Sequence, residues 1–428
     1  MQKQIKDEYK TSRFLYIFEA TFEYFISMLV GGAYLAKVTS AIGINDTLTG
    51  ILTSFVSLGW GFQLVAIFLA NKHPVKNWVT LLHGINHLAF ALIYFVPFFK
   101  IHKTIKILLF ITFLLVGYIL GNIVRSPKIN WFMSLVDDNK RGSFTANKEM
   151  VSLIGGMFFS FVMGLAIDHF EEIGNPNGAF ILLAISVLVF MVLHSCTLIF
   201  SKEKPYEEKE KVSVTQNLKE LITNKTIIKV ILISVFWNVA HYVATPFYGT
   251  YQIKELGFSM TFVSVLSACY AIVRTLFSKP MGKYADKTSF AKMLNVCFTI
   301  VLVAFAINTF TVPSNGKVFY TIYYILYAIA MAGINSSAIN LIFDYVDHDK
   351  RMSALALNSA LSGCAGFITT LLVSPIVSYI QNNGNKFLGI NVYAQQAMSA
   401  LAVVLTALLL LYLNTVIKNI TSKKDVQK

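Results

Sequence analysis

The sequence has few charged residues and few cysteines. Only 14% of its 428 residues are Asp, Glu, Lys or Arg, against about 25% in ordinary soluble proteins. The four cysteines, Cys196, Cys269, Cys297 and Cys364, each stand alone within an apolar run, without the spacing of a disulfide framework or a cysteine-bound metal site. We therefore expect neither soluble domains nor structural disulfides.

The sequence also lacks the short motifs that several enzyme classes need. It contains no G-x-x-x-x-G-K-S/T phosphate-binding loop, no H-E-x-x-H zinc motif and no G-x-S-x-G nucleophile motif. The apolar runs follow each other so closely that no soluble catalytic domain fits between them. We predict that the protein is not an enzyme, that it uses no cofactor and that ATP is not its energy source.

Apolar residues are abundant instead. Hydrophobic residues make up 55% of the chain, which has 35 Phe and a mean hydropathy of +0.61. An apolar helix of about 20 residues can span the ~30 Å hydrocarbon layer of a bilayer. Runs of this length predict an all-α membrane protein with twelve transmembrane helices: 13–37, 48–70, 78–98, 109–135, 144–167, 179–200, 227–253, 260–280, 290–311, 318–345, 353–380 and 393–416.

The net charge of +14 follows from the distribution of Lys and Arg along the chain. Most of these residues fall in every second loop, in the terminal segments and in the polar stretch 202–225, as expected for cytoplasmic segments. We therefore expect both termini and this stretch in the cytoplasm, a multi-pass cell membrane location, no cleaved signal and no binding of nucleic acid.

The chain contains an internal repeat. Residues 136–149 read VDDNKRGSFTANKE, and residues 346–359 read VDHDKRMSALALNS half a chain later. Each copy is a charged hinge between two apolar runs, which indicates a duplicated unit. We predict two pseudo-symmetric six-helix bundles, residues 1–200 and 227–428, joined by a linker at 201–226 that has a helical pattern from 214 to 222.

The cytoplasmic turns resemble those of the major facilitator superfamily. Gly282 to Lys287 read GKYADK, which fits the family signature Gly-x-x-x-Asp-Arg/Lys, and the first-half copy at Ala70 to Lys72 is degraded. The resemblance implies the family's twelve-helix fold and a cytoplasmic gate. The gate residues that we carry over are Asn71, Asp137, Arg141, Asp286, Lys287, Asp347 and Arg351.

Four charged residues lie deep in the first and fourth predicted spans, where charge is costly and points to function. Glu19 and Glu23 lie one turn apart on the first span, and Arg125 and Lys128 share a face of the fourth. At ~1.5 Å per residue, Glu23 lies about 15 Å and Arg125 about 18 Å from the cytoplasmic end. The sequence favours a Glu23–Arg125 pair, with Glu149 a further partner for Lys128 and a purely structural pair as the alternative.

The second half offers polar groups at comparable positions. Asn238 and His241 lie on the seventh span, and Asn335 on the tenth aligns with Arg125 in the repeat. His241 is as consistent with packing as with a proton relay. His83 and His87 lie four residues apart on the third span, but no carboxylate completes a site there, so we predict no metal site.

These features predict a secondary transporter for a small polar organic solute, working by alternating access between two halves. A proton gradient acting on Glu19 and Glu23 is the preferred energy source, with sodium as the alternative. A sugar-like solute is the first candidate. An anionic solute, drug–proton antiport and a non-transporting sensor with the same fold remain open. We expect a monomer in the lipid bilayer of a bacterial cell membrane.

Overall fold

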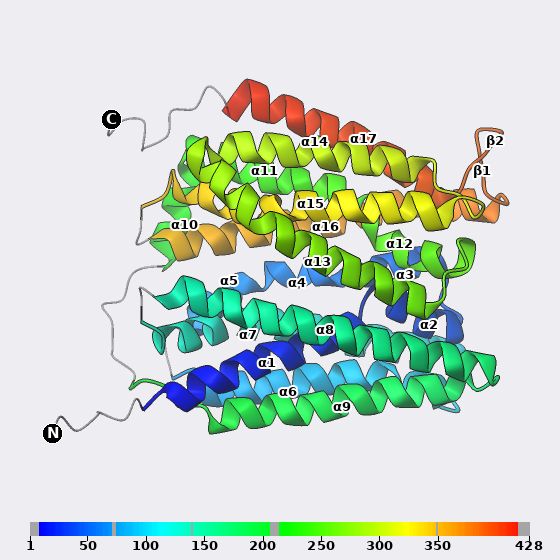
Figure 1. The fold of residues 1–428 in the computed structure, drawn as a ribbon, viewed down its shortest axis with the longest axis horizontal. Helices are drawn as coiled ribbons and strands as arrows, with labels where there is room; N and C mark the ends of the chain where they lie inside the picture. The colour runs from blue at the N-terminus through cyan, green and yellow to red at the C-terminus, as the bar shows by residue number, and fades with distance from the viewer. Residues whose placement is uncertain (1–7, 71–73, 138–139, 206–213, 348–349, 418–428) are drawn as a thin grey trace. The chain divides into compact units, whose positions relative to one another are not determined.

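The computed structural model describes residues 8–70, 74–137, 140–205, 214–347 and 350–417. Almost all of this part is helical (Figure 1). The sheet found in the described ranges is a hairpin of β1 (Lys386–Phe387) and β2 (Ile390–Asn391), with Lys386 opposite Asn391 and Phe387 opposite Ile390.

The helices follow the predicted spans. Those of the first half are α1 (Lys10–Leu29), α2 (Gly32–Ala41), α3 (Asp46–Thr53), α4 (Phe55–Gly61), α5 (Gln63–Ala70), α6 (Lys76–Ile93), η1 (Val96–Phe98), α7 (Lys103–Ser134), α8 (Arg141–Glu172) and α9 (Pro176–Phe200). The linker contains α10 (Val214–Thr223), which confirms the helical pattern predicted there.

The second half begins at α11. Its helices are α11 (Lys225–Tyr242), η3 (Thr245–Phe247), α12 (Tyr248–Thr250), η4 (Tyr251–Glu255), α13 (Met260–Lys287), α14 (Phe290–Thr309), α15 (Gly316–Phe343), α16 (Arg351–Asn382), α17 (Ala394–Tyr412) and η6 (Leu413–Ile417).

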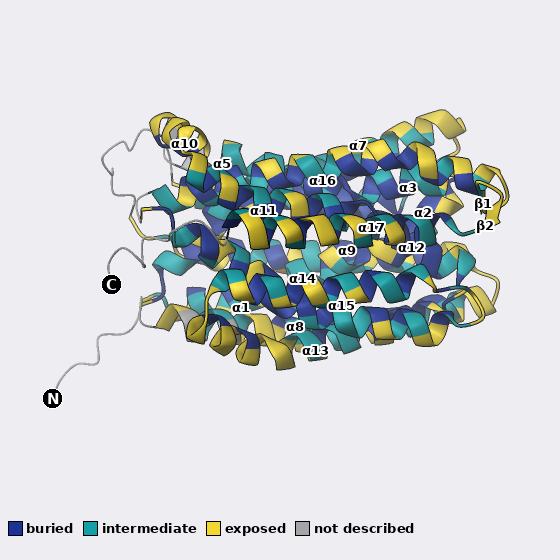
Figure 2. Ribbon diagram, turned by 90° about the horizontal axis from the view of Figure 1, so that it is seen from above, coloured by how far each residue is buried: buried dark blue, intermediate teal, exposed yellow. Residues whose placement is uncertain are grey.

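The chain is an all-α membrane protein. Ten helices of the described part are long and apolar enough to cross a membrane, or eleven if the pair α1 and α2, bent by 47°, counts as one. Large apolar side chains such as Phe158 (73% exposed) and Leu372 (71% exposed) face outward, as lipid contact requires. Figure 2 shows buried and exposed residues alternating along single helices such as α14 and α17. The prediction of twelve spans is consistent with this count. The predicted span that does not qualify as a membrane helix by hydropathy is α6, because its histidines and asparagines lower its mean hydropathy.

The repeat is visible in the backbone of the two hinges. Lys140 N donates to Asp137 O at 2.9 Å, and Lys350 N donates to Asp347 O at 3.0 Å. A helix of 32 residues begins directly after each turn, α8 at Arg141 and α16 at Arg351. The two copies of the motif therefore make the same backbone hydrogen bond before the same kind of helix.

By packing, the chain divides into two compact units, one of Met1–Gly31 with Val65–Val212, the other of Gly32–Leu64 with Ser213–Lys428. Residues 32–64 thus pack with the second half, through α3 and α4 against α16 and α2 against α12. The predicted bundles, 1–200 and 227–428, were inferred from the sequence repeat and not from packing. They therefore stay a prediction.

In the first unit, α1 packs against α8 and α9, and α6 packs against α7 and α9. Aromatic rings fill the space between α1 and α7, where Tyr16 stacks on Phe132 at 4.2 Å between centroids. Close approach needs glycine at Gly117, where an added Cβ would overlap the Phe90 ring, and at Gly156, where it would overlap the Tyr24 ring. Small residues at such positions let membrane helices pack closely.

In the second unit, α14 and α13 pack against α15, and α11 packs against α16 and α17. Tyrosines of α15 lie in contact with one another, with Tyr320 and Tyr323 fully buried and 5.2 Å apart between centroids. Gln252 donates to Tyr320 Oη at 2.8 Å, so this aromatic layer contains a polar partner.

Candidate functional site

Three charged side chains of α1 and α7 form one group, here called the carboxylate–lysine cluster: Glu19, Glu23 and Lys128. Lys128 Nζ lies 2.6 Å from Glu19 Oε1 and 2.6 Å from Glu23 Oε2. The side chains of Lys128 and Glu19 are 3% and 0% exposed, whereas that of Glu23 is 35% exposed. Glu23 is therefore the partly exposed member of the cluster.

The helices position these groups for simple reasons. Glu19 and Glu23 share a face of α1 because they are one turn apart. Lys128 follows Pro127, which has no N–H to donate and so interrupts the hydrogen-bond ladder within α7. Thr21 and Ser152 hydrogen bond at 3.1 Å and attach α1 to α8 on the other side.

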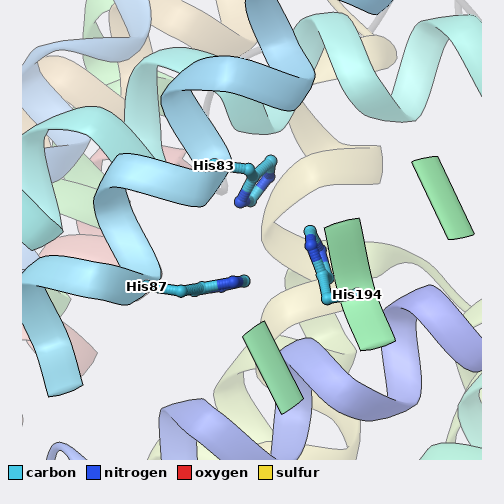
Figure 3. Close-up of side chains that lie close together, drawn as sticks. All are labelled: His83, His87 and His194. Carbon is cyan, nitrogen blue, oxygen red and sulfur yellow. The ribbon is translucent and has the colours of Figure 1, made fainter. Parts of the chain in front are cut away.

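His194 extends the cluster into the interior of the first unit. Its Nε2 lies 2.7 Å from Glu19 Oε1, so this one oxygen contacts both the imidazole and the ammonium of Lys128. The His194 ring also packs against His83 and His87 of α6, with centroids 4.8 and 4.5 Å away (Figure 3). Ionisable groups of four helices, α1, α6, α7 and α9, thus meet in one buried region.

The expected pairing of Glu23 with Arg125 is wrong. Lys128 takes both carboxylates, while Arg125 is exposed and forms no ion pair with any residue of the described ranges. Glu149, the other expected partner of Lys128, is also exposed and lies outside the cluster. Arg125 and Lys128 are close in sequence, but the rotation of α7 turns only Lys128 towards the glutamates.

The polar residues predicted in the second unit are separated by the fold. Asn238 is buried and donates to Ser234 O at 2.9 Å. His241 is half-buried, with Nδ1 2.8 Å from Tyr327 Oη and Nε2 3.1 Å from Thr245 Oγ1. Asn335 is exposed on α15. Asn238 is thus engaged with its own helix, whereas His241 belongs to an aromatic surface.

That surface, here called the aromatic patch, consists of His241, Tyr270, Tyr324 and Tyr327. Tyr270 lies 5.4 Å from Tyr324 and 6.3 Å from Tyr327 between ring centroids. His241, Tyr270 and Tyr324 are half-buried, so part of each ring is accessible. The sequence pattern pointed to His241 but not to the tyrosines, which come from α13 and α15.

The hinge residues are placed at helix ends. Asp137 pairs with Lys140 at 2.9 Å on the surface, and Arg141 Nε donates to Met133 O at 3.2 Å. The Arg351 guanidinium lies over the Phe343 ring, 4.8 Å from its centroid. Asp347 is exposed in the second hinge, and Asp286 and Lys287 are exposed at the end of α13. Asn71 lies outside the described residues, so the gate assignment stays a prediction.

The linker helix contacts the second hinge through an ion pair. Lys350 Nζ lies 2.5 Å from Glu220 Oε2, and Gln216 donates to Glu220 Oε1 at 3.3 Å. These two hydrogen bonds lower the pKa of the Glu220 carboxyl below its usual range. Figure 2 shows α10 mostly exposed. Among its described side chains, those of Asn217 and Leu221 are buried.

Sequence reasoning missed two further residues. His194 is the one acidic or basic side chain in α9, and its place in an apolar span was a signal that could have identified it. Glu203, beyond α9, accepts from Val75 N at 2.8 Å and Lys76 N at 3.1 Å, which places its carboxylate at the N-terminus of α6. No sequence signal connects Glu203 with residue 75.

Solved structures of similar fold are transporters. The nucleoside transporter NupG has a TM-score of 0.70 and 14% identity, over 96% of this chain and 99% of that one. The D-xylose–proton symporter has a TM-score of 0.64 and 14% identity, over 93% and 97%. A bacterial homologue of the human lysosomal transporter Spinster has 0.64 and 15%, over 98% and 100%. At these identities the likeness concerns the fold.

A comparison of the sequence with curated proteins found no significant match. The sequence does match the family described as Major Facilitator Superfamily, over residues 17–370 and again over residues 240–426. The first of these matches covers well over half of the chain, and together with the helical fold it shows that the chain belongs to the major facilitator superfamily of membrane transporters.

Proposed function

We propose that the protein is a secondary active transporter that moves a small polar organic solute by alternating access, driven by a proton gradient. The observation that carries the proposal is the pairing of Lys128 with two carboxylates inside a chain of this family. Charged groups at such depth are costly and are kept in membrane proteins mainly where ions or solutes move.

Glu23 is the group that we assign to the coupling proton. It is one-third exposed, and Lys128 Nζ is its one ion-pair partner in the described part of the chain. Glu23 can therefore exchange its ammonium partner for a proton without first uncovering a fully buried group. Lys128 would still be paired with Glu19 after that exchange, because it contacts both carboxylates.

The aromatic patch supports a sugar-like solute as the first candidate. The partly exposed rings of Tyr270 and Tyr324 offer apolar faces edged by hydroxyl groups. Both nitrogens of His241 are already engaged, by Tyr327 and Thr245, so His241 contributes its ring to the wall. Binding sites for small molecules combine such aromatic walls with a few polar groups. The D-xylose–proton symporter, a structure of similar fold, is named for a sugar and a proton.

An anionic solute is the second candidate, and Arg125 favours it. Its guanidinium is exposed on α7 and is not neutralised by an ion pair within the described ranges. A planar guanidinium can bind a carboxylate or phosphate with two hydrogen bonds. Binding of anions that is lost in Arg125→Gln, with binding of neutral sugars absent, would select this candidate.

The experiment begins with a thermal-shift screen of sugars, nucleosides, amino acids and organic anions against the purified protein. The solutes that stabilise it are then tested for uptake into vesicles with and without an inward proton gradient. We expect accumulation only with the gradient. No flux of any stabilising solute under any gradient would contradict the proposal and would favour a sensor with this fold.

The coupling residue is tested with Glu23→Gln, and Glu149→Gln serves as the matched control because Glu149 is exposed and outside the cluster. We expect Glu23→Gln to lose gradient-driven accumulation of solute but to keep the exchange of solute across the vesicle membrane. The control is expected to behave as the unchanged protein. Full accumulation in Glu23→Gln would exclude this carboxylate as the coupling group.

A further inference from the structure

Three histidines meet in the interior of the first unit, beside the carboxylate–lysine cluster. His83 and His87 lie one turn apart on α6, and His194 reaches them from α9, which packs against α6 (Figure 3). One ring nitrogen of each can be chosen so that all three lie within 4.8 Å of one another. This group, here called the tri-histidine cluster, is compact enough for the three rings to bind one small ligand.

Most of the ring nitrogens have no hydrogen-bond partner. The three residues are at most 2% exposed, and within the described ranges both nitrogens of His83, Nδ1 of His87 and Nδ1 of His194 are unpartnered. Asn86, the polar neighbour on α6, donates its amide to Gly117 O at 2.6 Å. Buried polar atoms are normally satisfied, so unpartnered nitrogens gathered in one place indicate a bound group that contacts them.

One of the rings already has the arrangement that metal-binding histidines adopt. His194 Nε2–H donates to Glu19 Oε1 at 2.7 Å, and the same oxygen accepts from Lys128 Nζ at 2.6 Å. A carboxylate that accepts from one ring nitrogen fixes the tautomer in which the other nitrogen presents its lone pair. Nδ1 of His194 is that other nitrogen, and it is unpartnered.

The charge of the surroundings favours a cation. Glu19 and Glu23 carry two negative charges and Lys128 one positive charge, which leaves the region with one negative charge while the imidazoles are neutral. Neutral imidazole is the preferred ligand of zinc, copper and nickel rather than of magnesium or calcium.

The distances suit zinc after a small contraction. Zinc binds histidine nitrogen at about 2.0–2.1 Å, which places the nitrogens of a tetrahedral site about 3.4 Å apart. The three nitrogens are at most 4.8 Å apart without the ion, and rotation of the rings about their side-chain bonds closes a difference of this size. Two histidines one turn apart on a helix are a common start of such a site.

Against the expectation from the sequence that His83 and His87 belong to no metal site, we propose that His83, His87 and His194 bind a zinc-type divalent metal ion. Glu19 is the positioning residue that orients His194. The ion is a resident of the fold rather than the transported solute, because all three ligands are almost completely buried. It joins α6 to α9, and through His194 and Glu19 it joins both helices to α1.

The test uses the purified full-length chain without a polyhistidine tag, freed of metal with a chelator. Isothermal titration with Zn²⁺ measures stoichiometry and affinity, and Co²⁺ supplies a visible spectrum that reports tetrahedral coordination. We expect one Zn²⁺ per chain, a Co²⁺ spectrum of tetrahedral type, and a higher melting temperature with Zn²⁺ than without it.

The variants His87→Gln and His194→Gln are each expected to lose this binding, and His169→Gln, an exposed histidine of α8, is the matched control. Glu19→Gln is expected to weaken Zn²⁺ binding about 10–100-fold, as loss of an outer carboxylate does, while leaving one equivalent bound. If a histidine variant does not fold, the rise in melting temperature with Zn²⁺ in the unchanged protein still tests the proposal.

Several results would overturn the site: no Zn²⁺ bound by the unchanged chain, no Zn²⁺-dependent rise in its melting temperature, or binding that survives replacement of His83, His87 and His194 together. The outcome is independent of the proposed transport. Glu23→Gln is expected to keep one Zn²⁺ bound, at lower affinity, since Glu23 supplies negative charge close to His194 but is not one of the three histidine ligands, so failure of proton coupling and failure of the metal site give different results.

Discussion

Replacement of Lys128 by methionine tests the electrostatics of the carboxylate–lysine cluster most directly. Methionine keeps most of the volume of lysine and removes its charge, so Glu19 and Glu23 lose their shared partner. Removing one partner of a buried pair costs about 3–5 kcal/mol, because the remaining charge stays buried and unpaired. We therefore expect Lys128→Met to lower stability substantially.

The structure places most of this cost at Glu19. Its side chain is 0% exposed, whereas Glu23 at 35% keeps contact with solvent and is screened. His194 remains as a donor to Glu19 and offsets part of the loss. With these two corrections, we expect Lys128→Met to lower the free energy of unfolding by about 3 kcal/mol, the lower end of the range for a broken buried pair.

The assay compares the melting temperature and the SDS-induced unfolding of the purified variants in detergent. Arg125→Met is the control, since Arg125 lies on the same helix but is exposed and outside the cluster; a surface change of this kind shifts stability by about 0.5 kcal/mol or less. The double variant Glu19→Gln, Lys128→Met is expected to recover most of the loss. Equal effects of Lys128→Met and Arg125→Met, or no recovery in the double variant, would refute the reasoning.

Three further predictions concern packing, pH and topology. Gly156→Ala is expected to destabilise the protein by about 1–3 kcal/mol, because the new Cβ overlaps the Tyr24 ring; the melting temperature measures this. The ion pair of Glu220 with Lys350 stabilises the fold at pH values above the usual carboxyl pKa, and this stabilisation is lost as pH falls through the lowered pKa of Glu220. In Glu220→Gln, the melting temperature is therefore expected to depend less on pH in the acid range. A cysteine at Lys219, exposed on α10, is expected to resist an impermeant reagent added outside intact cells, and labelling there would contradict the proposed topology.

The helices of this protein could be predicted because hydropathy and the repeat both reflect local sequence. Each apolar run must form its backbone hydrogen bonds within itself in lipid, so its length reports a helix. The hinges were found because the two copies keep the same charged residues before the same kind of helix, α8 and α16. Neither inference needs knowledge of which helices touch.

The pairing within the site could not be predicted in the same way. Depth along a helix follows from counting residues, and it correctly placed Glu23 level with the basic residues of α7. Rotation of α7 about its axis depends on packing against α1 and α6, such as Tyr16 on Phe132. This rotation turns Lys128, and not Arg125, towards the two glutamates. His194 lies on α9, more than 100 residues beyond His87 in the sequence, and only the tertiary fold brings these two residues together.

The shared oxygen of Glu19 has a consequence for how this site can evolve. Oε1 accepts from Lys128 on α7 and from His194 on α9 at the same time, so an apolar residue at position 19 leaves two donors on two helices without their acceptor. Substitution of any one of the three residues alone is penalised, whereas coordinated replacement by apolar residues is tolerated. Among relatives that retain this packing, the residues at positions 19, 128 and 194 are therefore expected to vary as a set.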